Sequence, residues 1–444
     1  MFKKYLQNFY NSTRLSIPIH NIRKILSIGF WFLWGIPLLT SSSIMVYDYP
    51  EKVRQFTHTI EFDYVDWTIK AIGEKIEQSS IRLEHYIAES QSTDIVREYI
   101  RAQREIQRLE AEISLLFSDP NVVKKTTAIQ PVQSNLSQFR QYRDRLAPMA
   151  ESILQSQISR VLGDTGLTTL GQPVPAVLFH STPLPVALIV SPRESIQQDA
   201  NISLFSDMTA EDMASLEDRV MSTLDVSALV VPVGGVGVYP TMVMATSNLE
   251  YLTETIAHEW VHNFLTLRPL GLNYDTSPEL RTINETTASI AGKEIGELVL
   301  RIYYPELLPA ETPETQTGET EKVPIEQILE PEVFSYREEM HKTRVTVDEM
   351  LSSGLIEEAE EYMEQRRKYF WENGYPIRRL NQAYFAFYGA YADAPGGAAG
   401  KDPVGPVVRA FRKQSGSLSV FLEQISWVTS LEELQRKVTI PVDD

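Results

Sequence analysis

The chain contains no cysteine and only seven histidines. The lack of cysteine excludes disulfide frameworks, thiolate nucleophiles, cysteine-ligated zinc and iron–sulfur clusters. Positive charge is also scarce, because 41 Lys and Arg residues stand against 59 Asp and Glu residues, for a net charge of -18. A nucleic-acid backbone is therefore not an expected partner. Any metal ion would have to be bound by histidine and carboxylate side chains.

Length and composition indicate a folded protein of more than one unit. The chain has 444 residues, and at about 100 to 200 residues per domain this suggests two to three units. Apolar residues make up 43% of the chain and charged residues 23%. These fractions are typical of globular proteins, so most of the chain can bury a core.

The N-terminal region contains an uncharged run at 25–47 that is long enough to cross a bilayer. Acidic residues follow the run, and five basic residues precede it without an acidic one: Lys3, Lys4, Arg14, Arg23 and Lys24. The positive-inside rule then predicts a cytoplasmic tail at 1–24 and a single-pass helix at 25–47 in the cell membrane, with the rest of the chain outside the cytoplasm. A buried core helix and a cleaved signal peptide are the alternatives.

Residues 48–165 show the apolar periodicity of amphipathic helices and predict a helical stalk. A second helix at 134–162 could fold back on the first as a hairpin, and the stalk is long enough for self-association. Residues 166–444 form the predicted catalytic domain, with mobile loops at 309–324 and 393–406, where Pro, Gly, Thr or Glu predominate.

The predicted fold class is α+β and mostly helical, with a small β-sheet packed on helices. Two short apolar runs, 175–180 and 185–191, are separated by Ser-Thr-Pro-Leu and resemble a hairpin. A helix at 209–223 precedes two further β-rich runs that flank Gly234, Gly235 and Gly237. From Ser247 onward the pattern is mainly helical.

The motif with the clearest chemistry is His258-Glu-Trp-Val-His262, within a predicted helix that Ser247 and Glu250 would begin as a capping box. Residues four apart lie on one helix face, so both imidazoles can bind one zinc ion. Glu259 lies beside them, where it can take a proton from zinc-activated water. The alternative is a purely structural histidine pair.

A third metal ligand must come from elsewhere in the chain. Arg268 stands where the longer zincin pattern has another histidine, so a carboxylate is needed. Glu285 lies 23 positions after His262 on a second apolar-periodic helix and is the best candidate; the alternative is an ordinary solvated carboxylate. Three other glutamates of this region are less well placed: Glu279, Glu294 and Glu297.

His258-Glu-Trp-Val-His262 followed by Asn284-Glu-Thr-Thr-Ala288 resembles the gluzincin group of zinc metallopeptidases, and within it the predicted bacterial aminopeptidases. The resemblance covers residues 245–300, and more loosely the C-terminal region. It implies a zincin-like fold, zinc bound by His258, His262 and Glu285, and Glu259 as the general base. Ser289 departs from the pattern, because thermolysin-type enzymes carry an acidic residue there that supports a histidine ligand.

The resemblance also implies an edge strand for substrate and a hydroxyl or imidazole donor for the transition-state oxyanion. GGVGVYP, at 234–240, occupies the place of the edge strand, where glycines could leave room for a peptide or simply form a turn. Tyr388 is the candidate donor and His341 its rival. Tyr388 belongs to a row of residues on one face of a predicted helix, whose side chains could equally pack in the core. The row consists of Asn381, Tyr384, Tyr388 and Tyr391.

These patterns predict a membrane-anchored zinc metallopeptidase that hydrolyses peptide bonds in a peptide or protein substrate. Whether it would be an aminopeptidase or an endopeptidase is open. The alternative is a membrane-anchored scaffold that binds partners and keeps a vestigial metal site.

Overall fold

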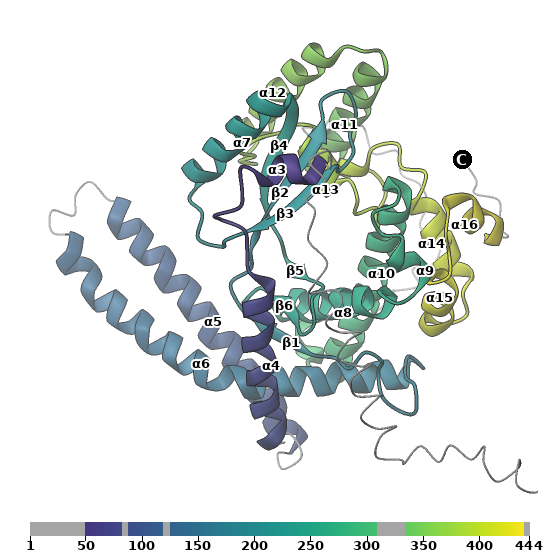
Figure 1. Cartoon of the computed structure of the whole chain (residues 1–444). Coiled ribbons are helices and arrows are strands. Elements are labelled where there is room, and N and C mark those ends of the chain that lie inside the picture. The colour runs from purple at the N-terminus through teal and green to yellow at the C-terminus, as the bar shows by residue number, and fades with distance from the viewer. Residues whose placement is uncertain (1–48, 82–87, 119–124, 309–333, 439–444) are drawn as a thin grey trace, which may run out of the picture. The chain divides into compact units, whose positions relative to one another are not determined.

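The computed structural model describes residues 49–81, 88–118, 125–308 and 334–438 (Figure 1). The chain divides into two units, residues 1–52 and 53–444. The predicted membrane segment at 25–47 and the predicted loop at 309–324 lie outside the described ranges. Within those ranges, no helix has both the length and the apolar character needed to cross a membrane.

The fold is α+β and mostly helical, as predicted. The described part of the chain contains two three-stranded sheets. The first has the order β3-β2-β4 and is antiparallel: β2 (Val186–Pro192), β3 (Ala200–Leu204) and β4 (Val226–Pro232). The second has the order β1-β6-β5: β1 (Phe179–Ser181), β5 (Gly235–Val236) and β6 (Thr241–Val243).

The predicted hairpin between 175–180 and 185–191 is wrong. β1 pairs in parallel with β6, with His180 opposite Met242, whereas β2 belongs to the other sheet. Pro183 and Pro185 lie in the connection and lack the N–H groups that a hairpin ladder would need. The connection therefore carries the chain from one sheet to the other.

The predicted stalk consists of α4 (Tyr64–Ile81), α5 (Glu89–Ser118) and α6 (Lys125–Asp164), which follow the short α3 (Tyr49–Arg54). α5 and α6 lie side by side (Figure 1), which confirms the hairpin, although α6 begins earlier than predicted. Tyr99 and Leu154 share one hydrophobic core with Phe179 and Trp260. The core is thus continuous across residue 165, and the hairpin is packed into the predicted catalytic domain.

Two helices at the centre of the structure approach each other closely: α8 (Leu249–Leu265) and α10 (Pro278–Tyr303), which the short α9 (Pro269–Leu272) connects. A Cβ atom added to Gly292 would lie 3.0 Å from the Cα of His258, and one added to Gly296 would lie 2.8 Å from the Cγ of Glu254. Glycine at these two positions lets α10 lie against the helix that carries both histidines.

α8 begins one residue later than predicted. Asn248 caps the helix by accepting a hydrogen bond from the N–H of Tyr251, whereas the Ser247 hydroxyl donates to Gln107. The predicted Ser247–Glu250 capping box is therefore wrong. Asn is an equally good N-cap, so a shift of one residue costs the helix little.

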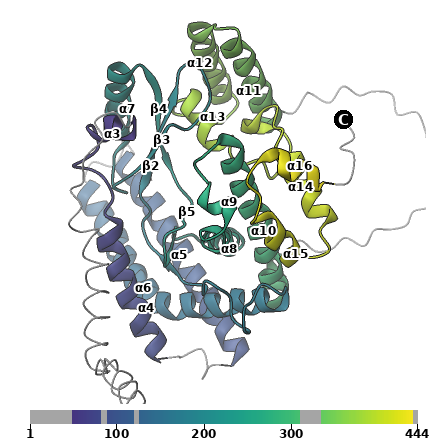
Figure 2. The same ribbon diagram turned by 45° about the vertical axis from the view of Figure 1, so that its right-hand side comes forward.

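The remaining elements surround the first sheet and α10 (Figure 2). They are α7 (Ala210–Leu224), α11 (Tyr336–Ser352), α12 (Ile356–Glu372), α13 (Gln382–Tyr388), α14 (Gly405–Gln414), α15 (Leu418–Ile425) and α16 (Leu431–Lys437), with short 3-10 turns at Pro305–Leu307 and Gly397–Ala399. Ala383 and Phe387 of α13 pack on Ile189 and Leu229 of the sheet. This contact places the end of α13 beside the candidate site.

The segment 393–406, predicted to be a mobile loop, contains a 3-10 turn and the first residues of α14, and it makes specific contacts with α11. Arg337 donates hydrogen bonds to the carbonyl oxygens of Pro395 and Gly396, and Arg344 donates to that of Ala398. These contacts fasten the segment to the body of the structure.

Candidate metal centre

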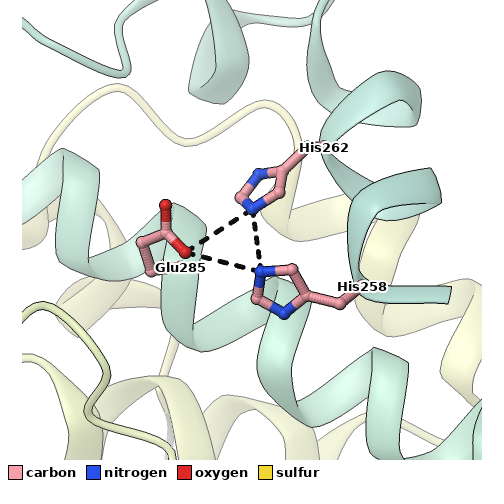
Figure 3. Close-up of side chains that lie close together, drawn as sticks. All are labelled: His258, His262 and Glu285. Carbon is pink, nitrogen blue, oxygen red and sulfur yellow. Dashed lines mark hydrogen bonds and ion pairs between the residues drawn. The ribbon is translucent and has the colours of Figure 1, made fainter. Parts of the chain in front are cut away.

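The structure brings the three predicted ligands together. The Nε2 atoms of His258 and His262 lie 3.0 Å apart, and each is 3.5 Å from the Oε2 atom of Glu285 (Figure 3). The histidines project from α8 and the glutamate from α10. Elsewhere in the described ranges, no other group of three His, Asp or Glu side chains is arranged to hold a metal ion.

This triangle has the dimensions of a zinc site. Ligand atoms about 2.0 to 2.1 Å from a tetrahedral zinc ion lie about 3.3 Å from one another. The three observed separations, of 3.0, 3.5 and 3.5 Å, bracket that value. In addition, the Oε2 atom of Glu285 is buried and accepts no hydrogen bond. Two nitrogens and an unsatisfied carboxylate oxygen thus converge on one point, as a divalent cation requires.

Asn284 orients one of the histidines. Its Oδ1 atom lies 2.8 Å from the Nδ1 atom of His262, while its Nδ2 faces the carbonyl of Leu270. In this arrangement the Nδ1–H of His262 donates to the amide oxygen, which leaves the Nε2 lone pair free for a metal ion. Ser289, at the position where thermolysin-type enzymes carry an acidic residue, lines the cleft. Asn284 is therefore the residue that contacts the Nδ1 atom of His262, a contact that sequence reasoning did not predict.

Tyr274 is a second supporting residue that sequence reasoning missed. Its hydroxyl donates a hydrogen bond to the Oε1 atom of Glu285, and its ring lies 6.2 Å from that of His262. The hydrogen bond fixes the Oε1 atom, so that the other carboxylate oxygen, Oε2, faces the two histidines. Tyr274 lies in the connection between α9 and α10, where no periodic pattern could have indicated its direction.

The electrostatics of the cluster favour a bound cation. Burial opposes ionisation of Glu285, but the two imidazoles hold the pKa of its carboxyl well below the usual range. Burial likewise disfavours the charged form of His262 and lowers its pKa. The neighbouring carboxylate of Glu285 has the opposite and larger effect, so the pKa of the imidazole is raised to about 9. Burial raises the pKa of Glu259. The site therefore holds a negative charge on Glu285 that attracts positive charge.

Glu259 lies against the glycine-rich strand. β5 is an edge strand, as predicted, because β6 is its only partner in the described sheet. A Cβ atom added to Gly235 would lie 2.5 Å from the Oε1 atom of Glu259, and one added to Gly234 would collide with the hydroxyl of Tyr251. The space into which side chains at these two positions would point is thus filled by side chains of α8, so these glycines accommodate α8, whereas the other hydrogen-bonding edge of β5 has no strand partner in the described sheet.

An open cleft of about 820 Å³ lies over the cluster, lined by β5, α8, α10 and the end of α13. Both Tyr388 and Tyr391 line it, but they differ in surroundings. The ring of Tyr391 lies 6.3 Å from that of His258, whereas Tyr388 packs on Tyr384 at 4.5 Å. Tyr388 as the oxyanion donor stays a prediction, and Tyr391 is the tyrosine of the two whose ring lies near a candidate ligand.

Other residues considered as site candidates lie elsewhere. His341 lies against Gly396 and does not line the cleft. Asn381 caps α13, accepting a hydrogen bond from the N–H of Tyr384, and its amide donates to the carbonyl of Ala228. Glu294 pairs with Arg412, so it is not available to the cluster, as expected from its position along α10.

Replacing Asn284 should weaken metal binding without removing a ligand. In Asn284→Ala the Nδ1–H of His262 loses its acceptor, and the loss of such a support lowers metal affinity about 10- to 100-fold. Asn284→Asp keeps an acceptor at the same place and should retain zinc. Competition with a calibrated chelator measures both. Equal affinity in the alanine variant and the wild type would show that Asn284 does not orient His262.

Comparison with protein-family models, with curated proteins and with solved structures finds no match to this chain.

Proposed function

We propose that this protein is a zinc-dependent metallopeptidase of the gluzincin type. The observation that carries the proposal is the triangle formed by His258, His262 and Glu285, with Glu259 beside it in an open cleft. Two imidazoles and one carboxylate are the ligand set of catalytic zinc sites that keep a position for substrate or water. When bound, zinc would supply Lewis acidity that polarises a scissile carbonyl and increases the acidity of water.

Glu259 would act as general base and then as general acid. Glu259 is 6% exposed as a residue, and its side chain lines the cleft where β5 meets α8. From there it would accept a proton from the attacking water and return it to the leaving amine. The Tyr391 and Tyr388 hydroxyls line the same cleft and could donate a hydrogen bond to the developing oxyanion.

The edge of β5 offers a place for the substrate backbone. Gly235, Val236 and Gly237 line the cleft beside Glu259. An extended peptide that pairs with this edge would pass the histidine cluster. Main-chain hydrogen bonds would hold the peptide and would not depend on which side chains it carries. This supports a peptide as the substrate class. An open cleft is compatible with cleavage either at the end of the substrate peptide or in its interior.

The predicted anchor and location belong to the same proposal. The uncharged run at 25–47 and its asymmetric flanking charges support a single-pass membrane helix, a cytoplasmic N-terminus and a catalytic domain outside the cytoplasm.

A membrane-anchored scaffold with a vestigial site is the second candidate. The observation that favours it is the α5–α6 hairpin, which extends from the body of the structure (Figure 1). It has a small hydrophobic core of its own, formed by Ile106, Leu109, Val132 and Leu136. A scaffold would hold less than stoichiometric zinc and would cleave no peptide.

Removal of the metal tests the proposal against this alternative. The full-length protein is incubated with a mixed peptide library, and the products are identified by mass spectrometry. We expect cleavage that a chelator abolishes and that added zinc restores, because the bound metal would supply the Lewis acidity that polarises the carbonyl and activates water. Cleavage that persists in the chelator, or no cleavage by zinc-loaded protein, would contradict the peptidase proposal.

A further inference from the structure

Arg281 on α10 presents a cation to the cleft but forms no ion pair with any carboxylate that the structure describes. Asp275 and Glu279 are its nearest acidic neighbours in the sequence, and neither pairs with it or lines the cleft. Its Nε atom is buried and meets no hydrogen-bond acceptor among the described residues. By contrast, the partly buried Arg412 donates two hydrogen bonds to Glu294. Partial burial of an uncompensated cation costs free energy that a bound anion would offset.

Arg281 lies next to the candidate metal centre. It precedes Glu285 by four residues, so both side chains lie on one face of α10, about 6 Å apart along the helix axis. Burial raises the pKa of Tyr274 well above its usual value, and the nearby guanidinium of Arg281 opposes this rise. The Tyr274 hydroxyl is neutral and already donates to Glu285, so it does not compensate the charge of Arg281. An anion bound to Arg281 would thus lie beside the metal position.

Arg281 and Glu254 mark opposite ends of the cleft. α8 and α10 run in opposite directions, because Gly296 lies against Glu254, whereas Asn284 lies against His262. Moving toward the start of α10 therefore means moving toward the end of α8. Arg281, one turn before Glu285, consequently lies past His262, at the end of the cleft that is far from Glu254.

The other cation that lines the cleft, Lys293, lies among carboxylates. Burial raises the pKa of Glu254 and Lys293 lowers it, which places these two side chains near each other. Glu250 and Asp393 line the same end of the cleft and raise the pKa of Glu254 further. Three carboxylates beside one lysine repel an anion. A carboxylate on a bound peptide would therefore be directed to the Arg281 end.

We propose that Arg281 binds a carboxylate of the peptide substrate and thereby determines which peptides the cleft accepts. A guanidinium matches a carboxylate because it donates two parallel hydrogen bonds to it. An extended peptide advances about 3.3 Å per residue, so the carboxylate would belong to a residue about one or two positions from the bond at the metal. Either the free C-terminus or an Asp or Glu side chain supplies this group. The inference rests on the proposed peptidase function and names its substrate class.

Peptide binding without turnover is the first test. Zinc-loaded full-length Glu259→Gln protein is titrated by calorimetry with three acetylated pentapeptides: pentaalanine amide, pentaalanine with a free C-terminus, and the amide with a central Glu. We expect at least one anionic peptide to bind about 10- to 100-fold more tightly than the neutral amide, because it gains charge-assisted hydrogen bonds. Preference for the free acid identifies the terminal carboxylate as the ligand, and preference for the Glu peptide identifies a side chain.

Substitutions in the same protein assign the preference to Arg281. Adding Arg281→Gln should make the affinities for the three peptides equal, and Arg281→Lys should restore part of the preference because it keeps the charge. Lys293→Gln is the matched control, since it removes the same charge from the other end of the cleft, and it should keep the preference. Zinc content should be equal in all variants. Equal affinities in the parent protein, no binding of any peptide, or a preference that survives Arg281→Gln would overturn the proposal.

Cleavage kinetics separate this inference from the peptidase proposal. With Glu259 intact, Arg281→Gln should lower kcat/KM for the preferred anionic peptide about 10- to 100-fold and leave that for the neutral amide unchanged. If the wild type cleaves peptides and Arg281→Gln keeps the same preference, the peptidase proposal stands and this inference fails. If calorimetry shows a preference that depends on Arg281 but no peptide is cleaved, the cleft binds anionic peptides without hydrolysing them, and the peptidase proposal fails.

Discussion

Glu259→Gln should abolish peptide hydrolysis while zinc stays bound. The amide has nearly the same size as the carboxylate, so it fits the space that Gly235 leaves beside α8. It cannot accept a proton from water, and loss of a general base lowers turnover by roughly 10²- to 10⁴-fold. The metal ligands His258, His262 and Glu285 are unchanged. Steady-state kinetics on a cleaved peptide, with zinc quantified in the same sample, measure both parts of the expectation.

Glu254→Gln is the matched control for this experiment. Glu254 lines the same cleft one turn before His258, so the substitution removes the same charge from the same helix. We expect it to leave most of the activity in place. If Glu259→Gln retains full turnover, or if the two variants lose activity equally, then Glu259 is not the proton acceptor.

Gly235→Ala should lower turnover nearly as strongly, although it changes no polar group. The added Cβ atom would lie 2.5 Å from the Oε1 atom, 2.8 Å from the Cγ atom and 2.9 Å from the Cδ atom of Glu259. Real Cβ atoms do not approach so closely, so either the carboxylate or β5 must move. Displacing a catalytic group by about 1 Å can cost about 100-fold in rate. We therefore expect a large fall in kcat with stoichiometric zinc.

Gly237→Ala provides the comparison within the same segment. Its added Cβ atom would meet Glu259 and His262 at 3.4 Å, which is an ordinary contact distance. This variant should keep near wild-type turnover. Wild-type activity in Gly235→Ala, or an equal loss in both variants, would show that close packing against Glu259 does not position the carboxylate.

The sequence was sufficient to predict the parts of the site that depend on local geometry. His258 and His262 lie four residues apart on a helix, and this spacing alone directs both imidazoles to one side. Glu285 required one further assumption, that a second helix returns beside the first. Gly292 and Gly296, which permit the close approach of that helix, were not recognised as packing residues.

Features that depend on the relative rotation of the helices could not be predicted. Asn284 was part of the motif, but its contact with His262 follows from how α10 is turned against α8. Tyr274 lies in an irregular connection without a pattern. The pairing of β1 with β6 joins residues about sixty positions apart, and no local signal distinguishes it from a hairpin. The observed N-cap of α8, Asn248, lies one residue after the predicted cap, Ser247, because two good capping side chains are adjacent in the sequence.

The zinc content of the wild type and of Glu285→Gln tests the account most directly. Both full-length proteins are loaded with zinc, dialysed, and analysed by mass spectrometry for metal per chain. We predict one zinc ion per wild-type chain and loss of most of it in the variant, because the amide removes the only anionic ligand from the cluster. Substoichiometric zinc in the wild type, or an equal content in the two proteins, would contradict the assignment of His258, His262 and Glu285 as a metal centre.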